Sequence, residues 1–65
     1  MDIVVNGRRE GCPGGSVADL VAARGLRPDA LVVELNGEII GQDRWPQVRL
    51  GDGDRLELLN FVGGG

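Results

Sequence analysis

Apolar residues along this chain of 65 residues form short extended runs and one helical stripe. Two of the runs, Asp2 to Val5 and Leu31 to Leu35, each lead into Asn-Gly. This dipeptide favours a tight hairpin turn because both central residues of the turn need positive φ. The sequence therefore predicts two β-hairpins, whose return strands run from Arg8 to about Cys12 and from Glu38 to Ile40. The first return strand is polar, and we expect it at an edge of the sheet.

A single helix is predicted between the two hairpins. It begins at Ser16, whose hydroxyl can accept a hydrogen bond from the backbone N–H of Asp19, the spacing of a capping box with Asp in place of Glu. Val17, Leu20 and Val21 follow at the i, i+3 and i+4 positions and form one apolar stripe. This stripe indicates that the helix packs one side against a sheet.

The end of this helix is also marked in the sequence. Gly25 suits the left-handed position just past a helix, with Leu26 able to fold back on Val21 as in a Schellman motif. Pro28 makes continuation of the helix unfavourable. We therefore expect the chain to leave the helix at Gly25 and to enter the second hairpin.

The last third of the chain predicts a loop and a final strand. The loop spans Gly41 to Pro46 and leads to a short segment from Val48 to Leu50. A turn at Gly51-Asp52-Gly53 then opens the last strand, from Asp54 to Phe61. One short helix cannot cover both faces of a sheet, so the sequence predicts an α+β fold with a mixed sheet packed on one face by a single main helix.

Alternate residues of a strand point to opposite faces of a sheet. The face toward the helix should carry the core, formed with the helix stripe by Ile3, Val5, Leu31, Val33, Leu35, Leu56, Leu58 and either Ile39 or Ile40. The uncovered face should carry the remaining apolar side chains, Val4, Val32, Leu59 and Phe61. Contiguous apolar patches on small proteins tend to be interaction sites, so we predict these four as a partner-binding surface. A slip of one residue in the last strand would exchange the two sets.

The composition excludes most catalytic chemistry. The chain has no His, no Lys, no Tyr and a single Cys, so it lacks most side chains that transfer protons, form Schiff bases or ligate metals. We therefore expect neither catalysis by the chain alone nor a metal site. Its net charge of −3 and scattered arginines argue against nucleic acid, which is bound by a basic patch, and mildly favour a partner with a basic surface.

The chain shows no sign of secretion or membrane insertion. Its start lacks the basic region and long apolar stretch of a secretory signal, and one cysteine forms no internal disulfide. No run approaches the roughly 18 apolar residues needed to cross a bilayer. We expect a cytoplasmic protein with no membrane partner.

Three local features have simpler structural interpretations. The run from Gly11 to Ser16 lacks the lysine and spacing of a phosphate-binding loop, so we interpret it as a turn followed by a helix cap. Cys12 has no activating neighbour in sequence and is expected to be a small, partly buried residue. Trp45 is expected to cover one end of the core.

The chain finishes with a glycine-rich tail. We expect one folded domain over residues 1–61 and a flexible tail over residues 62–65, Val62-Gly63-Gly64-Gly65. Glycine has no Cβ, so three in succession can enter a channel too narrow for side chains. Fully extended, the tail spans about 13 Å at roughly 3.3 Å per residue, far enough to bring the α-carboxylate of Gly65 into a partner's active site. A frayed terminus is the alternative interpretation.

Several fragments occur in a characteristic order along the chain, namely Asn6-Gly7, Ser16-Val17-Ala18-Asp19-Leu20, Val33 to Ile40, Trp45, Gly51 to Asp54 and Phe61 to Gly65. Each is weak alone, but in this order and at this length they resemble the ThiS family, the bacterial sulfur carriers of thiamin thiazole synthesis. The resemblance covers essentially the whole chain and implies the β-grasp, or ubiquitin-like, fold. The chain departs from the family at Gly41-Gln42, where such proteins often carry Pro-Arg.

The resemblance implies a reaction at the terminal glycine. An E1-like adenylyltransferase of the ThiF type, using ATP and Mg²⁺, would convert the carboxylate of Gly65 into an acyl-adenylate. Sulfur from a cysteine-derived persulfide, with a donor such as a cysteine desulfurase, would then displace AMP and leave a thiocarboxylate. A thiazole synthase of the ThiG type would draw this sulfur into the thiazole ring, with Val62, Gly63 and Gly64 entering the partner's active site. The chain itself would bind no cofactor and would be a protein co-substrate, not an enzyme.

Three alternatives remain open at the level of sequence. The small, MoaD-like subunit of molybdopterin synthase resembles this fold and also ends in Gly-Gly, although such chains are usually longer. A ubiquitin-like modifier would join Gly65 to substrate lysines. An inert β-grasp interaction module would leave its tail unmodified.

Overall fold

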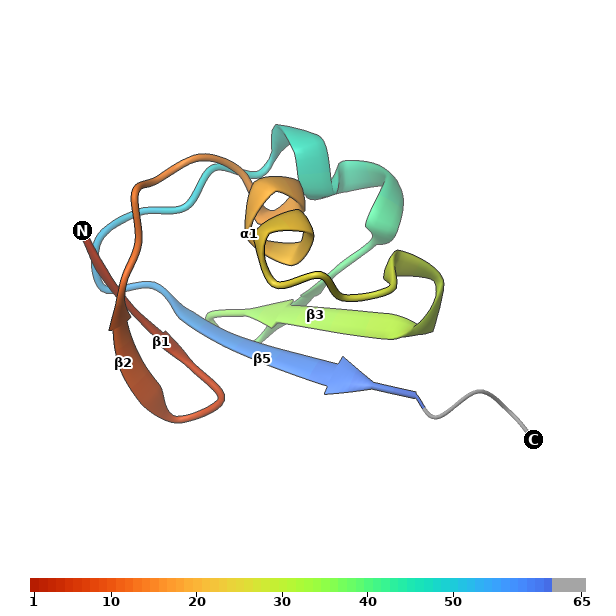
Figure 1. Cartoon of the computed structure of the whole chain (residues 1–65), viewed down its shortest axis with the longest axis horizontal. Helices are drawn as coiled ribbons and strands as arrows, with labels where there is room; N and C mark the ends of the chain where they lie inside the picture. The colour runs from red at the N-terminus through yellow and green to blue at the C-terminus, as the bar shows by residue number, and fades with distance from the viewer. Residues whose placement is uncertain (62–65) are drawn as a thin grey trace.

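The computed structural model describes residues 1–61. A five-stranded sheet carries helix α1 on one face, and its strand order is β2-β1-β5-β3-β4 (Figure 1). The elements in chain order are β1 Asp2–Val5, β2 Arg8–Gly11, α1 Val17–Ala23, η1 Pro28–Ala30, β3 Leu31–Leu35, β4 Glu38–Ile40, η2 Gln42–Gln47 and β5 Arg55–Asn60. β1 and β5 are parallel and the other neighbours are antiparallel. The predicted α+β fold, a mixed sheet with one main helix, is confirmed.

Both predicted hairpins are present and turn where the Asn-Gly pairs occur. Asn6 and Gly7 have φ values of 51° and 81°, and Asn36 and Gly37 have φ values of 52° and 86°. Positive φ at both positions is the conformation of a type I′ turn, whose twist matches that of the flanking strands. As predicted, polar β2 lies at one edge of the sheet, where Glu10 forms an ion pair with Arg24 at the end of α1.

The helix begins with the predicted capping box. The N–H of Asp19 donates to Ser16 Oγ at 3.1 Å, and the N–H of Ser16 donates to Asp19 Oδ2 at 2.9 Å. The Ser16 backbone N–H, then the Ser16 hydroxyl and the charge of Arg49, hold the pKa of the Asp19 carboxyl below its usual value because each favours the ionised form. These bonds satisfy donors that the first turn of a helix leaves unpaired.

The helix ends in the predicted Schellman motif. Gly25, with φ of 67°, donates its N–H to Ala22 O at 3.0 Å, and Leu26 donates to Val21 O at 3.3 Å. These are the two bonds that define the motif.

The core lies between the sheet and α1, as the alternation of apolar residues predicts. Its buried members are Ile3, Val5, Cys12, Val17, Val21, Leu31, Val33, Ile40, Trp45, Leu50, Leu56 and Leu58, while Leu20, Leu35 and others pack on it partly exposed. Of the two adjacent isoleucines, the structure buries Ile40 and leaves Ile39 exposed. Trp45 covers one end of the core, as expected, and its Nε1 donates to Ile40 O at 2.9 Å.

One prediction for the connections needs correction. The segment expected as a plain loop from Gly41 to Pro46 contains the 3₁₀ helix η2, which brings Trp45 into the core. The short segment from Val48 to Leu50 pairs with the residues that open α1: Val17 N donates to Val48 O and Leu50 N donates to Gly15 O, both at 2.9 Å. None of the helices within residues 1–61 has the length and apolar character required to span a membrane.

Candidate functional site

The candidate site lies at the end of β5, where the chain leaves the sheet. β5 is the central strand and pairs with β3 along five residues, from Leu31↔Asn60 to Leu35↔Leu56. The ladder continues one step further, because Phe61 N donates to Ala30 O at 2.7 Å. The described chain is therefore held in extended form up to Phe61, the residue before the tail.

The strand register brings four apolar side chains together on the open face of the sheet. Val32 lies opposite Leu59 on β3 and β5, and Phe61 follows Leu59 two residues later on the same face. Ile39 lies opposite Glu34, the next residue of β3 on this face after Val32. The exposed fractions of Ile39, Leu59 and Phe61 are 67%, 53% and 60%. We call these four residues the apolar patch; it extends from β4 across β3 to the end of β5.

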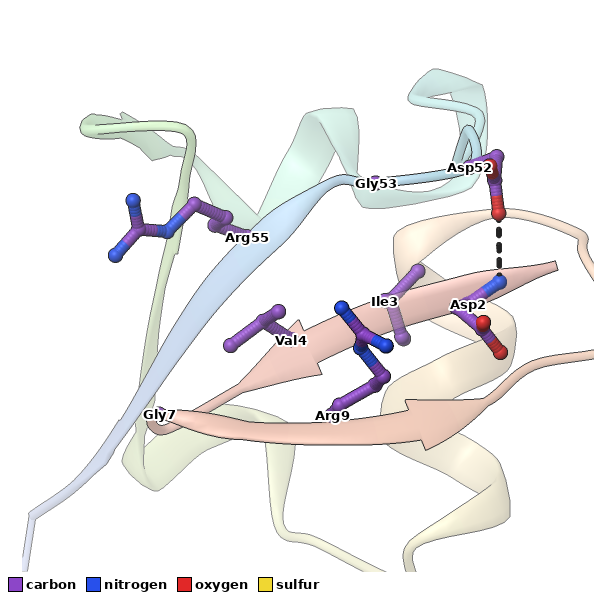
Figure 2. A pocket seen from close by; sticks show the side chains of 8 residues that line it. All are labelled: Asp2, Ile3, Val4, Gly7, Arg9, Asp52, Gly53 and Arg55. Atoms are coloured by element: carbon purple, nitrogen blue, oxygen red, sulfur yellow. Dashed lines mark hydrogen bonds between the residues drawn. The ribbon is translucent and has the colours of Figure 1, made fainter.

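Val4, predicted with this surface, lies elsewhere on the open face. It pairs with Arg55 at the start of β5, four residues or about 13 Å along the strand from Leu59. Figure 2 shows Val4 between Arg9 and Arg55, on the wall of an open hollow of about 470 Å³. Val4 therefore lies on the expected face but apart from Val32, Leu59 and Phe61, because its partner in β5 depends on a parallel pairing that the sequence does not specify. Its role in partner binding stays a prediction. Ile39 takes its place in the patch.

Two carboxylates stand at the border of the apolar patch. Glu34 of β3 lies directly opposite Glu57 of β5 on the open face. Like charges in this position repel one another and disfavour the pairing. A partner with cationic groups beside an apolar surface would relieve this repulsion, which agrees with the net charge of −3.

Two asparagine side chains, which the sequence did not predict as part of the site, hold β5 from both sides. At the β3–β4 turn, Asn36 Oδ1 accepts from Arg55 N at 3.0 Å, at the start of β5. At the β1–β2 turn, Asn6 Oδ1 accepts from Leu58 N at 2.8 Å, nearer the end of β5. Their backbone N–H groups also donate to β5, Asn6 to Leu56 O at 2.9 Å and Asn36 to Arg55 O at 2.7 Å. The Asn-Gly pattern signals the turns and gives no sign of these contacts with a strand far along the chain.

The predicted reactive end of the site lies outside the described residues. This end consists of Gly65, the predicted site of adenylation and thiocarboxylate formation, and of Val62, Gly63 and Gly64, which are predicted to enter the partner's active site. These assignments stay predictions.

Within residues 1–61 no group of three or more Asp, Glu or Cys side chains is placed to hold a metal ion. Cys12 is a free, buried thiol, and its Sγ accepts from Gly14 N at 3.4 Å.

This chain is similar to one family and to two kinds of known protein. The family model named ThiS matches residues 3–65. The chain is 45% identical over 51 residues to the sulfur carrier protein ThiS of Bacillus subtilis, an alignment that covers 78% of this chain and 77% of that protein. It is also 35% identical over 66 residues to a thiazole synthase of Paramagnetospirillum magneticum. That alignment covers 100% of this chain but only 20% of the larger protein.

Two solved structures have the same fold. The crystal structure of a thiamine biosynthesis protein (ThiS) from Geobacter metallireducens superposes with a TM-score of 0.86 at 32% identity, over 100% of both chains. A solution structure of a thiamine biosynthesis protein from the same organism gives a TM-score of 0.81 at 33% identity, over 100% of this chain and 88% of that one. The likeness in fold therefore extends over the whole chain.

Proposed function

Because this chain belongs to the ThiS family, we propose that it carries sulfur as a thiocarboxylate at Gly65 for the thiazole ring of thiamin. As a member of this family it is a small sulfur carrier protein. The observation that carries the proposal is the ThiS match over residues 3–65, which includes both the folded body and the terminal glycines.

The proposed chemistry takes place on the α-carboxylate and is catalysed by partners. A carboxylate resists nucleophiles, so an E1-like adenylyltransferase would first join it to AMP from ATP, with Mg²⁺, and release pyrophosphate. The terminal sulfur of a persulfide, from a donor such as a cysteine desulfurase, would attack the acyl carbon as AMP leaves. A thiol would then cleave the sulfur–sulfur bond and release the thiocarboxylate. We propose the cytoplasm as the compartment, because adenylation draws on ATP.

The proposed client is a thiazole synthase. The thiazole synthase of Paramagnetospirillum magneticum contains a segment similar to all of this chain, which supports a carrier and its client working together. In our proposal the present chain delivers sulfur to a separate thiazole synthase, and the enzyme returns the terminal carboxylate for another cycle.

The folded body would serve as the part of the chain that partners bind. The apolar patch lies beside the point where the chain leaves β5, so a partner that covers the patch also receives the residues that follow Phe61. Apolar area removed from water stabilises such a complex by about 25 cal/mol per Å² before the costs of association. The border carboxylates Glu34 and Glu57 favour a partner with cationic groups near its apolar surface.

The proposal is tested by the intact mass of the chain after incubation with an E1-like adenylyltransferase, ATP, Mg²⁺ and a persulfide donor. Replacement of one oxygen by sulfur, followed by its loss on addition of thiazole synthase and its other substrates, is the expected result. A variant lacking Gly65 should fold normally and gain no sulfur. A covalent adduct with another protein would indicate a modifier instead. No change in mass, with partners that load their own carrier, would indicate an inert module.

A further inference from the structure

The two long edges of β5 are supported very unequally. On the β3 side, the pairing extends to Asn60, and Phe61 N still donates to Ala30 O. On the β1 side, the strands pair only at Val4↔Arg55 and Val5↔Leu56. β1 stops there because the chain reverses at Asn6, where φ is 51°. The last part of β5 thus extends past the end of its parallel neighbour.

The side chain of Asn6 occupies the place where β1 would have continued. Its Oδ1 accepts from Leu58 N at 2.8 Å, and its Nδ2 lies 3.5 Å from Leu58 O. A primary amide carries the same donor and acceptor types as a peptide group, so this side chain replaces one further residue of strand pairing. Among residues 1–61, it is the only group with a described hydrogen bond to this edge of β5 beyond Leu56.

This contact lies three residues before Phe61 and is the last hydrogen bond on that edge within the part of the chain that the structure describes. By contrast, Asn36 holds Arg55, at the start of β5. The two asparagines have the same turn conformation and the same kind of bond to β5. They differ in which end of the strand they hold.

We propose that Asn6 is a positioning residue for sulfur transfer: its side-chain amide holds the end of β5, up to Phe61, in one orientation relative to the sheet. This inference rests on the proposed carrier function. Asn6 is not part of the apolar patch, and Leu59, the patch residue next to Leu58, also pairs with Val32 on the β3 side of the strand. Loss of the clamp should therefore lower the turnover of transfer more than the affinity for the carrier.

The test compares Asn6→Gly with Asn36→Gly. Glycine adopts positive φ at both turns without strain, so each variant keeps its hairpin and loses one side-chain clamp. We expect Asn6→Gly to lower kcat for sulfur transfer to thiazole synthase about tenfold, because small misplacements of reacting groups have large effects on rate, with KM for the carrier nearly unchanged. Asn36→Gly should lose about as much stability as Asn6→Gly and should leave kcat unchanged. Asn6→Asp keeps an acceptor for Leu58 N and should restore most of the rate.

Amide hydrogen exchange tests the clamp without any sulfur chemistry. Asn6→Gly should speed exchange at Leu58 and Phe61, and Asn36→Gly should speed it at Arg55 instead. Unchanged exchange at Phe61 in Asn6→Gly, or equal effects of the two variants on kcat, would overturn the proposal. Failure of the wild-type chain to accept sulfur would overturn the carrier function, while altered exchange would still show the clamp.

Discussion

Replacing Leu59 with threonine tests whether the apolar patch is the surface that partners cover. Complete burial of a leucine side chain contributes about 1.5–3 kcal/mol relative to an exposed one. Leu59 is 53% exposed in the free chain, so a partner that covers the remainder gains about 0.8–1.6 kcal/mol. Since 1.4 kcal/mol is a tenfold change in Kd, the loss corresponds to affinity about 4- to 14-fold weaker. Threonine retains a methyl group, which moves the expected value toward the lower end.

The same change should leave the fold intact. Threonine has a high propensity for strands, and substitutions at exposed positions usually change the free energy of unfolding by no more than about 0.5 kcal/mol. Titration calorimetry with thiazole synthase measures the affinity, and urea unfolding measures the stability. Val4→Thr is the matched control, because Val4 lies on the same open face but beside Arg55, away from the apolar patch.

Two results would refute the reasoning. One is a Leu59→Thr variant that is folded and binds thiazole synthase as tightly as the wild type. The other is a Val4→Thr variant that weakens binding as much as Leu59→Thr does, because the surface gripped by the partner would then extend over β1 and the hollow of Figure 2.

Further predictions concern the helix cap and the isoleucine pair. Folding lowers the pKa of Asp19 below its ordinary value of 3.8, so the stabilisation it provides is complete above that value and is lost as the pH falls through the lower pKa of the folded state. Asp19→Asn should flatten the pH dependence of the urea midpoint in this acid range, and an unchanged slope would contradict the capping role. Gly15→Ala should lower the free energy of unfolding by about 1–3 kcal/mol, the usual cost of a residue held in a disfavoured backbone conformation. Gly15 has φ of 102°, and a Cβ at this position would lie 2.7 Å from Asp19 Oδ2, the atom that accepts from Ser16 N. A variant as stable in urea as the wild type would contradict this prediction. Ile40→Ala should cost about 2–5 kcal/mol of stability as a core deletion, whereas Ile39→Thr should keep near wild-type stability and weaken partner binding. A large loss of stability in Ile39→Thr and none in Ile40→Ala would show that the two faces have been exchanged.

Much of the fold could be read from the sequence because its signals are local. The turn at Asn36-Gly37 and the helix limits at Ser16 and Gly25 each depend on residues a few positions apart, and the structure confirms all three. Alternation along β5 separated buried Leu56 and Leu58 from exposed Leu59 in the same way. Where two isoleucines were adjacent, alternation was ambiguous and the choice between them stayed open.

What the sequence determined by itself was the five strands, the main helix with its two caps and the two faces of each strand, since backbone conformation and side-chain alternation are properties of neighbouring residues. Only the tertiary structure decided which strands lie beside β5 and in what register. That choice put Ile39 in the apolar patch and Val4 outside it, and it brought the Asn6 amide to Leu58, 52 residues away along the chain. Pairing between distant strands is selected by how well the whole core packs, and no local pattern encodes that outcome.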